Sequence, residues 1–327
     1  MPRPPRIQYE NALYHVMNRG RARNNIFLNE DHYKIFLEVL KESVERFGCI
    51  IHAYCLMPNH YHLLIQTPIP NLTRVMRHIN AVYTQRYNRS QKTDGPLFRG
   101  RYKAILIESN QYLLHLTKYI HRNPIEVKTK NNQLTKNLKD YKWSSYPSYL
   151  NLTPTPKWLT KSTTLSLIKN DKDIIKRYQL YVDEENNPEI QSFFNKKNQN
   201  AILGNKEFKE DLLNKLLQNK TQQDQVKKEI RREITTQQII ESIATTFNIT
   251  TKSITQKATN KKAGNFPRKL AMYLCQKYKD HSLPKIAETF NLKNPQSISY
   301  YLGNVKKELQ GSKYKKEINS INQLLNV

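Results

Sequence analysis

The sequence predicts an α+β domain followed by an all-α domain. Over the first 150 residues, segments with the alternating pattern of strands take turns with segments of helical spacing. Helical periodicity alone returns near the C-terminus, and a length of 327 residues suits about two domains. We therefore expect a first domain at 1–150, a polar and mostly helical connector at 151–235, a helical domain at 236–310 and a tail at 311–327.

The elements of the first domain follow one another as strand, helix, strand, strand, helix, strand and helix. Gly48 is expected to end the first helix, Asn71 to cap the second, and Pro124 to stop the third. This order is that of a ferredoxin-like unit, an antiparallel sheet with helices on one face. The expected strands are 12–19, 49–56, 60–67 and 103–108, and the expected helices are 30–47, 72–88 and 109–124.

The charge balance is the strongest signal in the composition. Lys and Arg number 54 against 27 Asp and Glu, which gives a net charge of +27. Such an excess favours a polyanionic partner, with a basic protein that is merely soluble as the alternative. No apolar run is long enough to span a bilayer, so we expect no membrane association. Three cysteines without a CxxC pair suit a reducing cytoplasm.

His60 and His62 stand two residues apart at the start of the third expected strand. Alternate side chains of a strand share a face, so both imidazoles would project to one side from Cα atoms roughly 6.6 Å apart. Neutral imidazoles at this spacing can hold one divalent ion, whereas ordinary hydrogen-bonded strand histidines are the alternative. Because the other face of the strand is apolar, we expect the histidines on an open face of the sheet.

Tyr119 and Asn123 lie four residues apart in the last helix of the first domain, so they share a helix face. The amide oxygen of Asn123 is a hard neutral ligand that suits Mg²⁺ or Mn²⁺. A tyrosine beside such a metal can attack phosphorus and form a phosphotyrosine link. Packing is the alternative for Tyr119, since the chain has 20 tyrosines. His115, four residues before Tyr119, is expected to be a structural histidine.

Basic and aromatic residues are interleaved in a loop expected after the second helix. Cations can track a phosphate backbone while aromatic rings stack on unpaired bases, which suits single-stranded DNA. A solvated basic loop is the alternative. The residues expected to bind DNA here are Arg86, Arg89, Phe98, Arg99, Arg101, Tyr102 and Lys103.

Residues 282–309 predict a helix, a short turn and a second helix. Ser282 and Asn294 are the expected caps, with Pro295 at the first position of the second helix. This is the layout of a helix-turn-helix motif, whose second helix enters the major groove, and a plain helical bundle is the alternative. The residues expected to face DNA are Lys293, Gln296, Ser297, Ser299 and Tyr300.

Four motifs of the first domain resemble those of the single-tyrosine HUH transposases. They are YHVMNRG, MPNHYHLLI, GPLFRGRYKA and YIHRNP, in this order. The resemblance, over about residues 1–150, is to the REP-associated tyrosine transposases of the IS200-like group. It implies that His60, His62 and Asn123 hold Mg²⁺ or Mn²⁺ and that Tyr119 is the nucleophile. It also implies cleavage and strand transfer of single-stranded DNA at hairpin-bearing repeats, through a 5′-phosphotyrosine intermediate.

The helical domain resembles the DNA-binding domain of the bacterial replication initiator DnaA, through PRKLAMYL and the pair LPKIAETF and SISYYL. Asn294 and Pro295 stand where the initiator has an acidic residue and a histidine, so its own target sequence is not expected. The two resemblances imply a cytoplasmic, nucleoid-associated enzyme that also binds duplex DNA, and they admit a homodimer. The alternative is a DNA-binding regulator whose nuclease site is inert.

Overall fold

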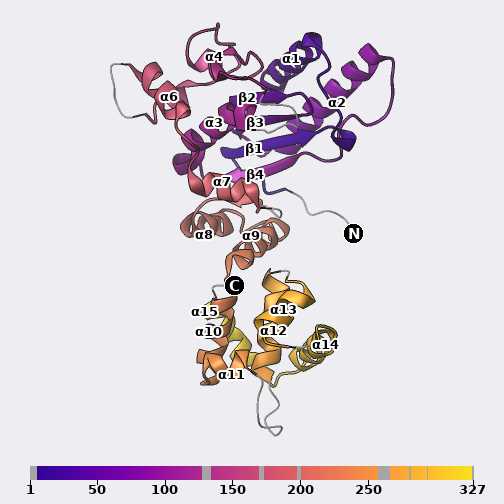
Figure 1. Cartoon of the computed structure of the whole chain (residues 1–327), viewed down its shortest axis with the longest axis vertical. Helices are drawn as coiled ribbons and strands as arrows, with labels where there is room; N and C mark the ends of the chain where they lie inside the picture. Colours follow the sequence, from indigo (N-terminus) through magenta and orange to yellow (C-terminus); the bar gives the residue numbers. More distant parts are fainter. Residues whose placement is uncertain are drawn as a thin grey trace. The chain divides into compact units, whose positions relative to one another are not determined.

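The computed structural model describes residues 6–126, 134–168, 173–196, 200–256, 266–279, 281–292 and 294–325. The chain forms two compact units, Met1–Gln222 and Gln223–Val327. The first holds a sheet with helices, and the described part of the second is helical (Figure 1). The prediction of an α+β domain followed by an all-α domain is therefore confirmed.

The first unit is built on a five-stranded sheet in the order β2-β3-β1-β4-β5. Figure 1 shows the first four of these strands side by side. They pair antiparallel and follow the ferredoxin-like order, as predicted, whereas β5 was not expected and pairs in parallel with β4. The strands are β1 (Ala12–Arg19), β2 (Ile50–Met57), β3 (His60–Thr67), β4 (Lys103–Ile107) and β5 (Ile202–Leu203).

Two helices, α1 (Glu30–Phe47) and α2 (Leu72–Gln91), pack on one face of this sheet. The ring of Phe36 in α1 meets that of Tyr61 in β3, and Asn80 in α2 accepts a hydrogen bond from the hydroxyl of Tyr61. Gly48 ends α1 with a left-handed φ of 64°, as expected. Asn71 occupies the N-cap position of α2 as expected, but its side chain makes no capping hydrogen bond, and its amide nitrogen donates to the carbonyl of Phe47.

A third helix, α3 (Ser109–Glu126), covers the opposite face of the sheet. Its Leu116 and Ile120 share a buried cluster with Leu64 of β3. The expectation that the helices lie on one face only is therefore wrong. The expectation that Pro124 stops this helix is also wrong, since the helix continues through Pro124 to Glu126.

The segment from 151 to 222 belongs to the first unit and is not a separate connector. Ile190 and Phe193 of α7 enter the same cluster as Leu116, and Tyr178 of α6 packs with Tyr146. Because these few apolar residues are spread among polar ones, the sequence pattern of this segment predicted a connector. The other helices of the first unit are η1 (Arg21–Arg23), η2 (Leu138–Asp140), α4 (Tyr146–Tyr149), α5 (Ser162–Leu165), α6 (Ile174–Asp183), α7 (Pro188–Asn195) and α8 (Lys206–Lys215). The next helix, α9 (Lys220–Glu233), begins in the first unit and continues into the second.

The described helices of the second unit surround one apolar core. One of them, α10 (Thr236–Phe247), begins with a capping box in which Thr235 and Gln238 exchange side-chain and backbone hydrogen bonds. Ile321 of α15 enters the core, so the expected tail is part of the domain. The helices are α10 (Thr236–Phe247), α11 (Thr251–Thr255), α12 (Phe266–Lys279), α13 (Leu283–Thr289), α14 (Gln296–Gln310) and α15 (Lys315–Leu324).

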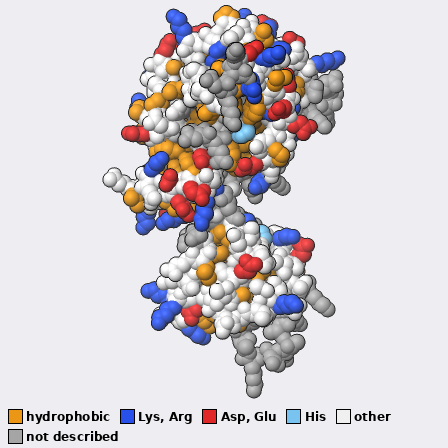
Figure 2. Space-filling view, turned by 90° about the vertical axis from the view of Figure 1, so that its left-hand side faces the viewer, with side chains coloured by type: hydrophobic (Ala, Val, Ile, Leu, Met, Phe, Trp, Pro, Cys, Tyr) orange, Lys and Arg blue, Asp and Glu red, His pale blue; other side chains and the backbone are white. Residues whose placement is uncertain are grey.

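The described residues include no helix that is both long and apolar enough to cross a membrane. Cys49, Cys55 and Cys275 are free thiols in buried positions. On the face of the molecule drawn in Figure 2, Lys and Arg side chains are spread over both units.

Candidate functional site

His60 and His62 lie on the face of the sheet that α3 covers. Their ring centroids are 5.0 Å apart, so the predicted common orientation holds. Only 7% of His60 and 5% of His62 is exposed, and the expectation of an open sheet face is therefore wrong. The pattern of one strand shows which side chains share a face, but not which distant helix covers that face.

Each of these imidazoles has one ring nitrogen held by a neighbour. Nδ1 of His60 lies 2.6 Å from the amide oxygen of Asn59, and Nδ1 of His62 lies 2.9 Å from Nε2 of His15. Because Nδ1 of His60 faces an oxygen acceptor, its Nε2 atom can offer a lone pair. Nε2 of His62 offers one in the tautomer in which Nδ1 carries the hydrogen. Burial and the charge of Arg19 lower the pKa of His60 to about 4, and burial lowers the pKa of His62 well below its usual value. Both rings are neutral at pH 7.

β1 contributes a histidine and an arginine for which no role was predicted from the sequence. In the antiparallel register with β3, Arg19 is opposite His60 and Met17 is opposite His62. His15 follows on the same face and is fully buried. Alternation along residues 12–19 already groups these three side chains. Their register against the histidines of β3 could not be predicted, because it depends on pairing between distant strands.

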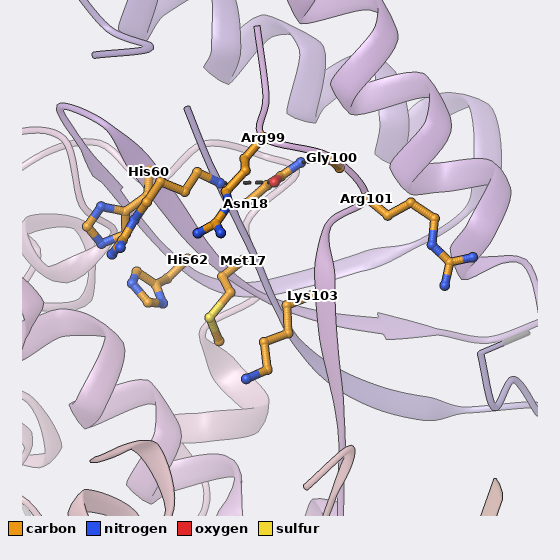
Figure 3. Close-up of a pocket in the computed structure, with 9 residues that line it drawn as sticks. Met17, Asn18, His60, His62, Arg99, Gly100, Arg101 and Lys103 are labelled. Atoms are coloured by element: carbon orange, nitrogen blue, oxygen red, sulfur yellow. Dashed lines mark hydrogen bonds between the residues drawn. The ribbon is translucent and has the colours of Figure 1, made fainter. Parts of the chain in front are cut away.

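A cavity of about 620 Å³ opens beside the histidines (Figure 3). Four cationic side chains line it, and none of the described lining residues is acidic. Such a lining favours an anionic ligand. Figure 3 shows Arg101 extending away from the two histidines. The lining residues are Met17, Asn18, Arg19, His60, His62, Arg99, Gly100, Arg101 and Lys103.

The two aromatic residues expected to stack on bases are buried, with 7% of each exposed. Phe98 meets the ring of Tyr61 edge-on, and the guanidinium of Arg6 lies 3.6 Å from the ring centroid of Tyr102. Because this segment folds back against the sheet, neither ring is available as a stacking platform in this structure.

The two arginines expected from the same stretch lie on α2, which runs to Gln91, and not in a loop. Arg86 pairs with Glu42 of α1 at 2.7 Å, and Arg89 is exposed. Neither of them lines the cavity. Of the cations predicted in this stretch, the structure thus brings Arg99, Arg101 and Lys103 to the cavity.

α3 places the ring of Tyr119 beside two histidines. Its centroid lies 6.3 Å from that of His62 and 5.9 Å from that of His15. Phe194 of α7 stacks on the other side at 4.3 Å, and burial raises the pKa of the Tyr119 hydroxyl. Asn123 is buried one turn later, where its amide nitrogen donates to the carbonyl of Tyr119 at 2.8 Å. Neither Tyr119 nor Asn123 lines the cavity.

The other histidine considered on this helix has a structural partner. Nδ1 of His115 lies 2.6 Å from the hydroxyl of Tyr181 in α6. His121 is similarly engaged, since its two ring nitrogens each lie 2.7 Å from a hydroxyl, that of Ser145 and that of Tyr178. Both histidines join α3 to the neighbouring segments of the first unit.

In the second unit, α13 and α14 form the predicted helix-turn-helix. Ile286 of α13 and Ile298 of α14 are fully buried in the common core. The amide oxygen of Asn294 accepts from the backbone of Gln296 at 2.9 Å, but the N-cap position of α14 is occupied by Pro295 and not by Asn294 as expected. The helix begins at Gln296, one residue later than expected. The side chain of Ser282, at the start of α13, makes no capping hydrogen bond.

The first turns of α14 carry the residues expected to face DNA. Gln296, Ser299 and Tyr300 are exposed, the last by 69%, and Ser297 is half-buried. Lys293 lies outside the described residues. The second helix of the motif thus presents an uncovered polar surface at its N-terminal end.

Residues 8–123 match the family model described as "Transposase IS200 like". This part of the first unit is therefore similar to the IS200-like transposases. The two paired histidines, Tyr119 and Asn123 all lie within the matched residues. Residues 236–305 match the model "Bacterial dnaA protein helix-turn-helix", so the second unit is similar to the helix-turn-helix domain of DnaA.

Two further similarities accompany these matches. The chain is 36% identical over 81 residues to the chromosomal replication initiator protein DnaA of Corynebacterium jeikeium (strain K411). The shared part is 25% of this chain and spans only 14% of the length of that relative. The chain is also similar to a solved structure of a REP-associated tyrosine transposase bound to a REP hairpin. That match has a TM-score of 0.40 at 16% identity, and it covers 49% of this chain and 92% of the other.

Proposed function

We propose that this chain is a metal-dependent transposase that cleaves single-stranded DNA and transfers the strand, with Tyr119 as the nucleophile. The main support is the position of the Tyr119 ring, 6.3 Å from that of His62. His62 in turn lines a cavity with four cationic side chains. A phenol can supply the nucleophile, a pair of neutral imidazoles can bind a metal, and a cationic cavity can stabilise the charge of a phosphate.

The residues around the histidines fit a divalent metal such as Mg²⁺ or Mn²⁺. His60 and His62 would bind it through Nε2, because their Nδ1 atoms are held by neighbours. No group of three His, Cys, Asp or Glu in the described part of the chain is placed to hold a metal. A further ligand would therefore be of another type, and we propose the amide oxygen of Asn123. A metal in this position polarises the scissile phosphate and stabilises the charge that develops on it.

The cationic side chains of the cavity would hold the DNA backbone. Arg19 is opposite His60 in the strand pairing, and the backbone of Arg99 bonds to that of Arg19. Lys103 comes from β4. Guanidinium groups bind phosphate oxygens through two parallel hydrogen bonds, which fixes the phosphate as well as attracting it. We propose that these three side chains orient the scissile phosphate beside the histidines.

The cleavage step exchanges one phosphorus–oxygen bond for another. The Tyr119 oxygen, after losing its proton, bonds to phosphorus, and the bond from phosphorus to the 3′ oxygen breaks. The departing oxygen keeps the electron pair and takes a proton, which leaves a 3′-hydroxyl and a 5′-phosphotyrosine. Attack by another 3′-hydroxyl reverses the exchange, joins the strands and frees Tyr119.

We also propose that α14 of the second unit reads duplex DNA beside hairpin-bearing repeats. The support is its exposed N-terminal surface with Gln296, Ser299 and Tyr300. Side chains at this end of a recognition helix are the ones that reach base edges in the major groove. A homodimer and an association with the nucleoid stay predictions.

An adduct assay tests the proposed chemistry. The full chain is incubated with hairpin oligonucleotides that carry a single-stranded 5′ extension, in Mn²⁺, and then denatured. We expect a covalent protein–DNA adduct that EDTA prevents and that Tyr119→Phe abolishes. The matched control is Tyr112→Phe, which removes a hydroxyl two turns earlier on α3 that donates to Glu189 at 2.7 Å. This control should still form the adduct, and an adduct that survives Tyr119→Phe would refute the assignment.

One observation favours the alternative of a DNA-binding regulator without cleavage. Tyr119 is packed between histidines and Phe194, and it does not line the cavity. The same assay separates the two functions, because a regulator would bind the hairpin oligonucleotides without forming an adduct at any of the repeat sequences tested.

A further inference from the structure

His15 lies between the proposed nucleophile and one of the proposed metal ligands. Its Nε2 atom is 2.9 Å from Nδ1 of His62, and the two rings are stacked with centroids 5.1 Å apart. The edge of the His15 ring also meets Tyr119 and Phe194, at centroid distances of 5.9 and 5.0 Å. The side chain is fully buried and does not line the cavity. It therefore contacts the site residues without facing the cavity.

The surroundings of His15 make a polar ring costly at this position. Its neighbours across the sheet are Leu64 on β3 and Ile105 on β4, both buried in an apolar cluster. Nδ1 of His15 is buried and has no hydrogen-bond partner among the described residues. A fully buried imidazole among apolar side chains is favoured in its neutral form. Within the described part of the chain, its one hydrogen bond to another side chain is the one with His62.

This contact links the tautomers of the two rings. A hydrogen bond between two neutral imidazoles needs one nitrogen that carries a hydrogen and one that does not. If His15 donates from Nε2, then His62 accepts at Nδ1 and carries its own hydrogen on Nε2, where it cannot bind a metal. If His62 donates from Nδ1, its Nε2 atom presents a lone pair toward the cavity, and His15 carries its hydrogen on Nδ1.

We propose that His15 is a positioning residue that accepts the Nδ1 hydrogen of His62, and thereby holds His62 in the metal-binding tautomer and orientation. This inference rests on the proposed function, since it assumes that His62 binds the divalent ion. His15 touches neither the metal nor DNA. Partners that hold the outer nitrogen of a metal-binding histidine typically change metal affinity about 10–100-fold when they are removed.

Two substitutions test whether His15 acts through its hydrogen bond to His62 or only by packing against its neighbours. His15→Phe keeps an aromatic ring against Tyr119 and Phe194 but has no acceptor for His62. His15→Gln has a different shape but can offer its amide oxygen near the position of Nε2. Binding of Mn²⁺ to the full chain is measured from the loss of the free-ion signal in electron paramagnetic resonance. Folding of each variant is checked by thermal unfolding.

We expect His15→Phe to weaken Mn²⁺ binding about 10–100-fold and His15→Gln to bind within a few-fold of the unchanged chain. The matched control is His52→Phe. His52 is another buried strand histidine whose Nε2 is bonded to a side chain, Gln66, while its Nδ1 lacks a partner among the described residues. His52→Phe should leave Mn²⁺ affinity unchanged. If His15→Phe does not fold, His15→Leu takes its place, with the same expected loss.

Unchanged affinity in a folded His15→Phe protein would overturn the positioning role, as would loss of affinity in His15→Gln alone. His60→Ala tests the site itself and should abolish binding. If His60→Ala binds Mn²⁺ normally, or if the unchanged chain does not bind it saturably, the proposed metal site fails and the inference fails with it. Loss in His60→Ala with no loss in His15→Phe refutes the inference alone.

Discussion

The fold strongly alters the protonation of its buried imidazoles. Burial lowers the pKa of His60 to about 4 and the pKa of His15 to about 3, from an ordinary value of 6.5. At a pH between the ordinary pKa of 6.5 and the lowered pKa, the unfolded chain binds protons that the folded chain excludes. Acidification in this range therefore favours unfolding. Each such histidine costs about 1.4 kcal/mol for every pH unit below its ordinary pKa.

We therefore expect the midpoint of thermal unfolding of the full chain to fall by several degrees from neutral pH to about pH 5, as measured by calorimetry. His121, whose pKa burial lowers to about 3, acts in the same direction. His60→Asn should show a smaller fall, because it has no imidazole to protonate at that position. A midpoint that does not change over this range would mean that these rings are not buried and neutral as described.

At the scale of elements, local patterns predicted most of the first domain. The first strand and first helix have the predicted bounds because alternation, helical spacing and Gly48 are all local signals. The position of α3 on the second face, the added strand β5 and the site residues of β1 depend on contacts between distant segments. Because of those contacts, His60 and His62 are buried and His15 lies beside His62.

The N-terminal end of α14 should carry the duplex specificity of the second unit. A glutamine in the major groove can make two hydrogen bonds to adenine, a contact worth about 1–3 kcal/mol of discrimination. We expect Gln296→Ala to weaken binding of the full chain to its preferred duplex about tenfold, as measured by fluorescence anisotropy. Gln310→Ala is the control, since this glutamine is exposed at the other end of the same helix. Equal effects of the two changes would exclude α14 as the reading helix.

At the scale of the whole molecule, the net charge of +27 is spread widely, whereas the proposed chemistry needs charge at one cavity. On the face drawn in Figure 2, Lys and Arg appear on both units. General attraction between the basic protein and DNA therefore does not identify the site. A site at the cavity requires that the cations of the cavity contact phosphates, and the salt dependence of binding measures the number of such contacts.

Arg99→Ala should lower the slope of log affinity against log salt for a single-stranded oligonucleotide by about 0.7, because one phosphate contact is lost. Arg77→Ala is the matched control, as Arg77 is exposed on α2 and does not line the cavity. This control should leave the slope nearly unchanged. The same loss of slope in both variants would indicate a diffuse basic surface with no phosphate site at the cavity.

Of the 20 tyrosines in the chain, we propose that Tyr119 alone becomes linked to DNA. The most direct measurement is mass spectrometry of peptides from the adduct formed in Mn²⁺ after nuclease digestion. We predict a single modified peptide that carries a 5′-linked nucleotide on Tyr119. A nucleotide on any other tyrosine, or no modified peptide from a chain that binds both the hairpin and Mn²⁺, would contradict the account.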